Sequence, residues 1–186
     1  RRLARHTDAF LAVGTAVASE AVRRKLVRPE QIWAVDGAMD VAPRVATPET
    51  RRAARTALGL APHVPVAGTV GRLDEQKAPG DFVTAIATSE HRDLVGVWIG
   101  DGPLRAEVTA QARTLGVDHR ILFAGQRTDV ADLLPAFDVF VMSSLYEGLP
   151  CALLEAIACG LPVVATAVNA VPDVVTPGRP GTRRGI

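Results

Sequence analysis

Lysine is scarce in this sequence, and neither sign of charge is in excess. Only Lys25 and Lys77 are lysines among 21 basic residues, and 20 acidic residues leave a formal net charge of +1. A protein that binds nucleic acid normally has a clear basic excess, so we expect no nucleic acid partner. Because arginine replaces lysine almost everywhere, a lysine inside a glycine-rich motif is more informative than usual.

Cysteine and histidine are too sparse to indicate a disulfide or a metal site. Cys151 and Cys159 fall in one expected helix at a separation of roughly 12 Å, which is beyond the reach of a disulfide. We expect both to be small buried hydrophobic residues in a reducing, cytoplasmic compartment. The histidines are scattered singly, without the spacing of metal ligands: His6, His63, His91 and His119. The sequence therefore predicts neither a metal site nor a cofactor.

Long apolar runs are absent as well. No stretch approaches the ~20 apolar residues of a membrane span, so we expect no transmembrane segment. Residues 1–18 imitate a signal peptide, with a basic start and an Ala-x-Ala end. The apolar stretch nevertheless continues directly into a helical pattern that contains Glu20, which favours a folded segment over a cleaved leader.

Short apolar runs of strand length alternate with helical stretches. The runs are almost continuously hydrophobic, as in parallel strands covered on both faces: 9–14, 31–35, 64–70, 94–99, 120–124, 138–142 and 162–166. The helical stretches lie between them: 16–27, 48–58, 80–90, 103–115, 128–136 and 150–159. This is the spacing of successive βαβ units, so we expect an α/β fold with a Rossmann-like, doubly wound parallel sheet.

The 186 residues are enough for one large domain and part of another. Residues 1–35 hold too few elements to bury a core alone, so we expect the closing part of an upstream α/β domain. Residues 36–62 are expected to form a linker and a first helix, and residues 63–178 the main domain. The basic, turn-rich end at 179–186 predicts an irregular, interrupted tail, which together with the missing initiator methionine indicates a fragment.

Two cations follow the strand expected at 64–70. In an open parallel sheet, ligands bind where strands end and turn into helices. Gly71 permits close backbone approach there, Arg72 offers a planar fork, and Lys77 a point charge, which together suit a diphosphate. The same residues also fit an exposed loop with solvated charges, and this motif alone does not decide between the two.

Two further strand ends have small or polar residues. Gly100, Gly102 and Pro103 precede a helix, with Pro103 expected in its first turn, and the glycines would let a ligand approach. Gly125 and Arg127 follow the next strand and offer polar groups for a base or phosphate. Ordinary strand-to-helix connections use the same kinds of residues, so neither turn alone indicates a ligand site.

The helix expected at 150–159 has an isolated acid. Glu155 is the only charged residue after Glu147 and before Gly160, so the helix should be covered on nearly all sides. A buried carboxylate needs hydrogen bonds, and the two hydroxyls of a sugar diol are one good source of them. The alternative is an ion pair with an arginine elsewhere. The helix N-terminus, with the N–H groups of residues 149–152, could hold a phosphate.

These turns, taken in order, resemble the donor-binding half of retaining glycosyltransferases of family 4, which have the GT-B fold. The matching segments are Gly71-Arg72-Leu73 with Lys77, Gly100-Asp-Gly-Pro103, Leu122-Phe-Ala-Gly125, and Glu147-Gly-Leu-Pro150 with Glu155. The two glutamates eight positions apart are the most specific part. The likeness covers about 64–178, and weakly 7–40, where the usual linker motif is replaced by Asp36-Gly-Ala-Met-Asp40.

The resemblance implies a sugar transfer from a nucleotide sugar with retention at the anomeric carbon and without metal. It implies catalytic roles for Arg72 and Lys77 at the donor diphosphate and for Glu147 at the transferred sugar. It implies donor contacts for a further set, with Glu155 on the ribose diol and the Gln126–Val130 loop beside the base: Gly71, Gly100, Gly102, Arg127, Gly148, Leu149, Pro150, Cys151 and Glu155.

The expected partners are a UDP-, GDP- or ADP-linked sugar and an unknown acceptor. Residues 1–35 would be the remnant of the acceptor domain, through whose missing part peripheral membrane association is possible. We expect the fragment alone not to turn over. A nucleotide-sugar 2-epimerase on the same fold, a non-catalytic nucleotide-sugar-binding module and an inert truncated product stay open. An NAD-dependent oxidoreductase does not fit, because Gly68-Thr-Val-Gly71 lacks the Gly-x-Gly-x-x-Gly spacing.

Overall fold

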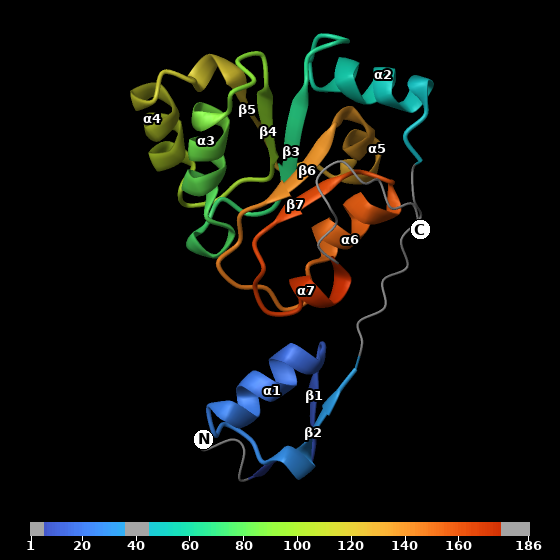
Figure 1. The fold of residues 1–186 in the computed structure, drawn as a ribbon, viewed down its shortest axis with the longest axis vertical. Coiled ribbons are helices and arrows are strands. Elements are labelled where there is room, and N and C mark those ends of the chain that lie inside the picture. Colours follow the sequence, from blue (N-terminus) through green and yellow to red (C-terminus); the bar gives the residue numbers. More distant parts are fainter. Residues whose placement is uncertain (1–5, 36–44, 176–186) are drawn as a thin grey trace.

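The computed structural model describes residues 6–35 and 45–175, apart from the side chain of Asp173. The expected irregular tail at 179–186 and residues 36–44 of the expected linker lie outside these residues. Within them the strands form two separate sheets, one of two strands and one of five (Figure 1).

The larger sheet consists of five parallel strands. These are β3 (Val66–Val70), β4 (Val95–Ile99), β5 (Ile121–Gly125), β6 (Val139–Met142) and β7 (Val163–Ala165). Their order is β5-β4-β3-β6-β7, and every pairing is parallel. The chain builds outward from β3 to β5 and then crosses back to β6, so the order reverses between β3 and β6. The doubly wound parallel sheet expected from the sequence is confirmed.

Helices cover both faces of this sheet (Figure 1). One face packs on α3 (Pro79–Thr88) and α4 (Arg105–Thr114), and the other on α2 (Pro48–Ala57), α5 (Val130–Leu133) and α6 (Cys151–Ala158). Side chains alternate between the two cores, as they must along a strand: Val66 and Val97 belong to one, and Ala67 and Trp98 to the other. Burial on both faces explains why the strand sequences are hydrophobic throughout.

Most helix boundaries follow local chemistry. The side chain of Thr47 accepts a hydrogen bond from the Thr50 amide at the start of α2, and the Thr50 hydroxyl accepts one from the Thr47 amide, which makes a capping box. At two places in the larger unit the structure differs from what the sequence predicts. The helix expected from residue 103 starts at Arg105, so Pro103 lies in the turn before it. The short α7 (Val171–Val174) was not expected at all.

The N-terminal residues form a small unit of β1 (Phe10–Ala12), α1 (Thr15–Arg23) and β2 (Ile32–Ala34). Its two strands pair with each other and not with the larger sheet. α1 ends at Arg23, four residues earlier than the pattern at 16–27 predicts. Among the described residues, no helix is both long and apolar enough to cross a membrane.

Candidate functional site

Two loops meet where the strand order reverses, at the carboxyl ends of β3 and β6. The loop after β6 lies against the 3₁₀ helix Glu75–Lys77 that follows β3. The Leu145 amide donates to the Gln76 carbonyl at 2.8 Å, and the Gln76 side chain donates to the Tyr146 carbonyl at 3.0 Å. In an open parallel sheet such a reversal is where ligands bind. The fold therefore places the turn after β3 and the loop after β6, both singled out from the sequence, side by side.

Lys77 and Glu147 form an ion pair at this junction, with 2.6 Å between Nζ and Oε1. The Glu147 side chain is only 4% exposed and that of Lys77 24%. The Glu147 amide donates to Oδ1 of Asn169 at 3.0 Å. The sequence pointed to both charged residues but gave no sign that they pair, nor that Asn169 takes part. A buried carboxylate without such a partner would be very costly.

Arg72 lies at the edge of the site. Its side chain is 78% exposed and is paired with Asp74, whose Oδ2 lies 2.8 Å from Nε. Burial alone would raise the pKa of the Asp74 carboxyl, but hydrogen bonds from Arg72 and from the Lys77 amide hold its pKa below the usual value. The sequence reasoning missed Asp74, although an acid just before a short helix is a recognisable cap. The structure thus joins Arg72 to Asp74 and not to the Lys77–Glu147 pair.

The glycine turns after β3 and β4 touch each other. A Cβ on Gly100 would stand 2.0 Å from the Gly71 carbonyl oxygen, and one on Gly102 would stand 2.5 Å from that of Leu73. The Trp98 indole donates to the same Gly71 oxygen at 2.8 Å. Close backbone approach, and not only access for a ligand, therefore requires these glycines.

Helix α6 starts at the site without a cap. Its N-cap, Pro150, makes no side-chain cap hydrogen bond, and no acid occupies the first turn. The uncapped end and its dipole favour an anion. Of residues 149–152, which were expected to offer N–H groups to a phosphate, Pro150 has no N–H, and the Cys151 amide already donates to the Leu149 carbonyl at 2.9 Å. Cys151 is exposed, so the expectation that both cysteines are buried holds only for Cys159.

Glu155 is half-buried on α6, and its carboxylate has neither a hydrogen bond nor an ion pair with any described residue. Burial raises the pKa of its carboxyl. The arginine partner that the sequence left open is therefore not found in the part of the chain that the structure describes. Only Leu153 and Ala156 of α6 are fully buried, so the helix is less covered than expected.

A buried hydroxyl and a further ion pair also lie at this edge of the sheet. The Ser144 hydroxyl, just after β6, is buried without a hydrogen-bond partner. Arg127, after β5, forms a two-point ion pair with Asp129, at 2.8 and 2.6 Å, which lowers the Asp129 pKa and raises that of Arg127. β5 is the edge strand, so Arg127 follows a strand that is separated from β3 by β4. Within the described residues, no hydrogen bond or ion pair joins Arg127 to the Lys77–Glu147 pair.

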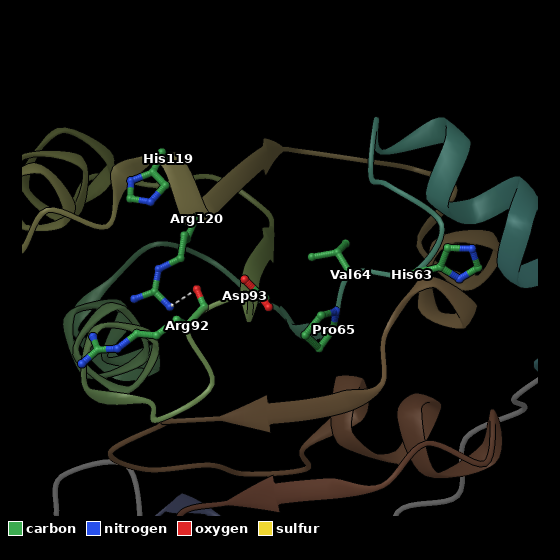
Figure 2. Close-up of a pocket in the computed structure, with 7 residues that line it drawn as sticks. All are labelled: His63, Val64, Pro65, Arg92, Asp93, His119 and Arg120. Atoms are coloured by element: carbon green, nitrogen blue, oxygen red, sulfur yellow. Dashed lines mark hydrogen bonds between the residues drawn. The ribbon is translucent and has the colours of Figure 1, made fainter.

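A depression of about 470 Å³ lies at the opposite, amino edge of the sheet (Figure 2). Its lining is His63, Val64, Pro65, Arg92, Asp93, His119 and Arg120. Arg120 is largely buried and donates to the carbonyls of Ile86 and Arg92, both at 3.1 Å. It thereby closes the C-terminal end of α3, which is a structural role. Over 6–35 and 45–175 no three metal-ligating side chains cluster at either edge.

Comparison with known proteins identifies the family to which the chain is similar. Residues 64–184 match the family described as glycosyl transferases group 1. The chain is 37% identical over 164 residues to a D-inositol 3-phosphate glycosyltransferase of Mycobacterium marinum, covering 83% of this chain and 34% of that protein. It is 39% identical over 117 residues to an alpha-1,3-galactosyltransferase of Escherichia coli that acts with UDP-Gal, covering 60% and 30% respectively.

Solved structures show the same fold. Anabaena HepE, crystallised with UDP and glucose, superposes with a TM-score of 0.84 at 24% identity, over 92% of this chain and 47% of that one. The lipopolysaccharide glycosyltransferase WaaG superposes with a TM-score of 0.77 at 23% identity, over 88% and 46%. The chain thus spans about a third of the length of these curated relatives and about half of these structures. The sequence match and the doubly wound sheet together show that this chain belongs to the glycosyl transferases group 1 family.

Proposed function

We propose that this chain is the donor-binding half of a glycosyltransferase that moves a sugar from a nucleotide sugar to an acceptor, with retention at the anomeric carbon. The names of its relatives support this: one uses UDP-Gal, and HepE was crystallised with UDP and glucose. The region that matches the family, residues 64–184, contains the two loops and the helix that form the site. The upstream half of such an enzyme would supply the acceptor site.

The observation on which the proposal depends is the unpaired acid on α6. Glu155 is half-buried and lacks a partner among the described residues, and burial raises its pKa. Such a group is costly unless a ligand satisfies it. A ribose offers two adjacent hydroxyls that can both donate to one carboxylate. Glu155 would then hold the nucleoside, and the bound nucleotide would repay the cost of burying the acid.

Cations and a helix end would hold the diphosphate. Lys77 lies at the junction of the two loops, Arg72 lies at its edge, and α6 begins there without a cap. When the bond between the anomeric carbon and the β-phosphate breaks, negative charge grows on the departing diphosphate. Lys77 and the helix dipole would stabilise that charge, and Arg72 would do so on leaving or sharing Asp74.

Glu147 would contact the transferred sugar. Its carboxylate accepts from Lys77 through Oε1 at 2.6 Å, and no hydrogen bond or ion pair is found for Oε2 within 6–35 and 45–175. A carboxylate has about four acceptor sites, so a sugar hydroxyl can add to the ion pair without breaking it. Lys77 would in that way link the diphosphate and sugar subsites through one charge.

Calorimetric titration of this chain tests the proposal. UDP, GDP, ADP, UDP-glucose, GDP-mannose and ADP-glucose would be titrated into the wild type, Glu155→Ala and, as control, Glu107→Ala on the exposed face of α4. Loss of hydrogen bonds to a charged group costs about 1.5–3 kcal/mol, so we expect Glu155→Ala to raise the Kd about 10- to 100-fold. Equal affinities in all three proteins would contradict it. Conversion of a nucleotide sugar without any acceptor would instead support a 2-epimerase.

A further inference from the structure

Asn169 has a backbone conformation that is unusual for a residue with a side chain. Its φ is +45°, and within the described residues only Lys25 and Ala78 are other non-glycine residues with positive φ. Asparagine tolerates this left-handed region better than most residues, but glycine adopts it at less cost. The Asn169 side chain makes a specific contact, in which Oδ1 accepts a hydrogen bond from the Glu147 amide at 3.0 Å.

The loop between β7 and α7 therefore holds the loop after β6 at two points. Besides the contact of Asn169, the Thr166 hydroxyl donates to the Ser144 carbonyl at 2.6 Å. From the other side, Gln76 bonds both to the Leu145 amide and to the Tyr146 carbonyl. Glu147 comes directly after these contacts. Its backbone is thus held by Asn169 on one side while its carboxylate is held by Lys77 on the other.

Glu147 needs such support because its neighbours supply little. Leu145 and Tyr146, the two residues before it, have exposed side chains and no place in the core. The Glu147 residue itself is buried, so its amide would be an orphan donor without the oxygen of Asn169. A carboxylate on a loop binds a sugar well only if its position is fixed to within about 0.5 Å.

We propose that Asn169 is a positioning residue, which fixes Glu147 against Lys77 and so sets the affinity for the sugar part of the donor but not for the nucleotide. This rests on the proposed function, in which Glu147 contacts the sugar and Glu155 the nucleoside. Asn169 touches neither ligand group in that scheme. Its effect on the donor passes through the Glu147 backbone alone.

Two substitutions separate the side chain from the backbone conformation. Asn169→Gly keeps the positive φ and removes the acceptor, while Asn169→Asp keeps an acceptor oxygen and tolerates the same conformation. Loss of one hydrogen bond costs about 0.5–1.5 kcal/mol, which corresponds to about 2- to 10-fold in affinity. We expect Asn169→Gly to weaken nucleotide-sugar binding by that factor and to leave the Kd for the free nucleoside diphosphate within about twofold. Asn169→Asp should restore most of the difference.

Amide hydrogen exchange of Glu147, followed by NMR on the same three proteins without ligand, gives a second readout. Asn169→Gly should exchange about 10-fold faster at this amide, and Asn169→Asp should resemble the wild type. Unchanged exchange in Asn169→Gly would overturn the positioning role, and so would faster exchange without any loss of sugar-dependent affinity. A wild type that binds none of UDP-glucose, GDP-mannose and ADP-glucose would reject the proposed function instead, while the exchange rates would still decide whether Asn169 holds Glu147.

Discussion

The two edges of the five-stranded sheet differ in how fully the protein pairs their polar and charged groups. At the amino edge, Asp138 accepts from Arg51 at 2.5 Å, from Arg55 at 2.9 Å and from the Val66 amide at 2.8 Å. At the carboxyl edge, Glu155 has no partner among the described residues and the Ser144 hydroxyl is buried without one. Buried polar groups are normally satisfied, so the exceptions need an explanation. The amino edge stabilises the fold, whereas the proposed function assigns the unsatisfied groups of the carboxyl edge to a ligand.

The contrast is sharpest for arginine. Arg55, at the amino edge, is 3% exposed and donates to the carbonyls of Ala61, Pro62 and Ala136 besides Asp138. Arg72, at the carboxyl edge, is 78% exposed and has a single acidic partner. An arginine that is saturated by the protein cannot reorient toward a ligand, whereas one with free N–H groups can. Arginine thus serves stability at the amino edge, and under the proposed function it would serve binding at the carboxyl edge.

The largest effect on stability should come from the amino edge. Asp138→Ala leaves Arg55 buried without its counter-charge, and breaking a buried ion pair costs about 3–5 kcal/mol. Because the Asp138 side chain is itself partly exposed, we expect a loss of about 3 kcal/mol in the free energy of unfolding. Urea denaturation measures it, with Asp93→Ala, an exposed acid at the same edge, as control. Donor affinity of the folded protein should not change; a large drop would mean that the two edges are coupled.

The next effect concerns Lys77. Lys77→Met keeps the length of the side chain and removes the charge, so both the diphosphate and Glu147 lose their cation. We expect nucleotide-sugar affinity to fall about 30-fold, since a charge-assisted hydrogen bond contributes about 2 kcal/mol. Calorimetry checks this, with Lys25→Met as the matched control at the other, exposed lysine. If free nucleoside diphosphate bound equally well to both variants, Lys77 would have no role at the diphosphate.

The fold could be predicted from the sequence because its signals are local. A strand buried on both faces must be apolar throughout, and a helix that ends in the left-handed region needs a residue such as Gly59, Gly116 or Gly160, all of which have positive φ. The four-residue α7 leaves no periodic pattern long enough to detect. Pro103 was misplaced because proline suits a turn as well as a first helical position.

The site could be predicted only in part, for a related reason. Glu155 was found because an unpaired acid changes the composition of its own helix. The Lys77–Glu147 pair joins residues 70 positions apart, and no local pattern reports such a contact. Asn169 acts through one side-chain hydrogen bond, and only the folded chain brings its partner, the Glu147 amide 22 positions away, within reach. Residues with chemistry of their own can be named from sequence, whereas those that hold them in place need coordinates.

The smallest expected effect concerns Glu155 at the carboxyl edge, whose substitution should change stability and donor binding in opposite directions. Burial raises the pKa of Glu155 in the folded protein, so the folded state binds its proton more tightly than the unfolded state does. The corresponding stabilisation is fully present below the unfolded pKa and is lost as pH rises through the folded pKa. At neutral pH the wild type therefore buries an unfavourable charge, and Glu155→Gln removes it. We expect the variant to melt about 1–2 °C higher than the wild type at pH 7 and at the same temperature near pH 4, while it binds the donor more weakly. Thermal unfolding over this pH range tests the sign: a variant that melts lower at pH 7 would show that the carboxylate is satisfied within the protein, as Asp138 is, and that the two edges do not differ.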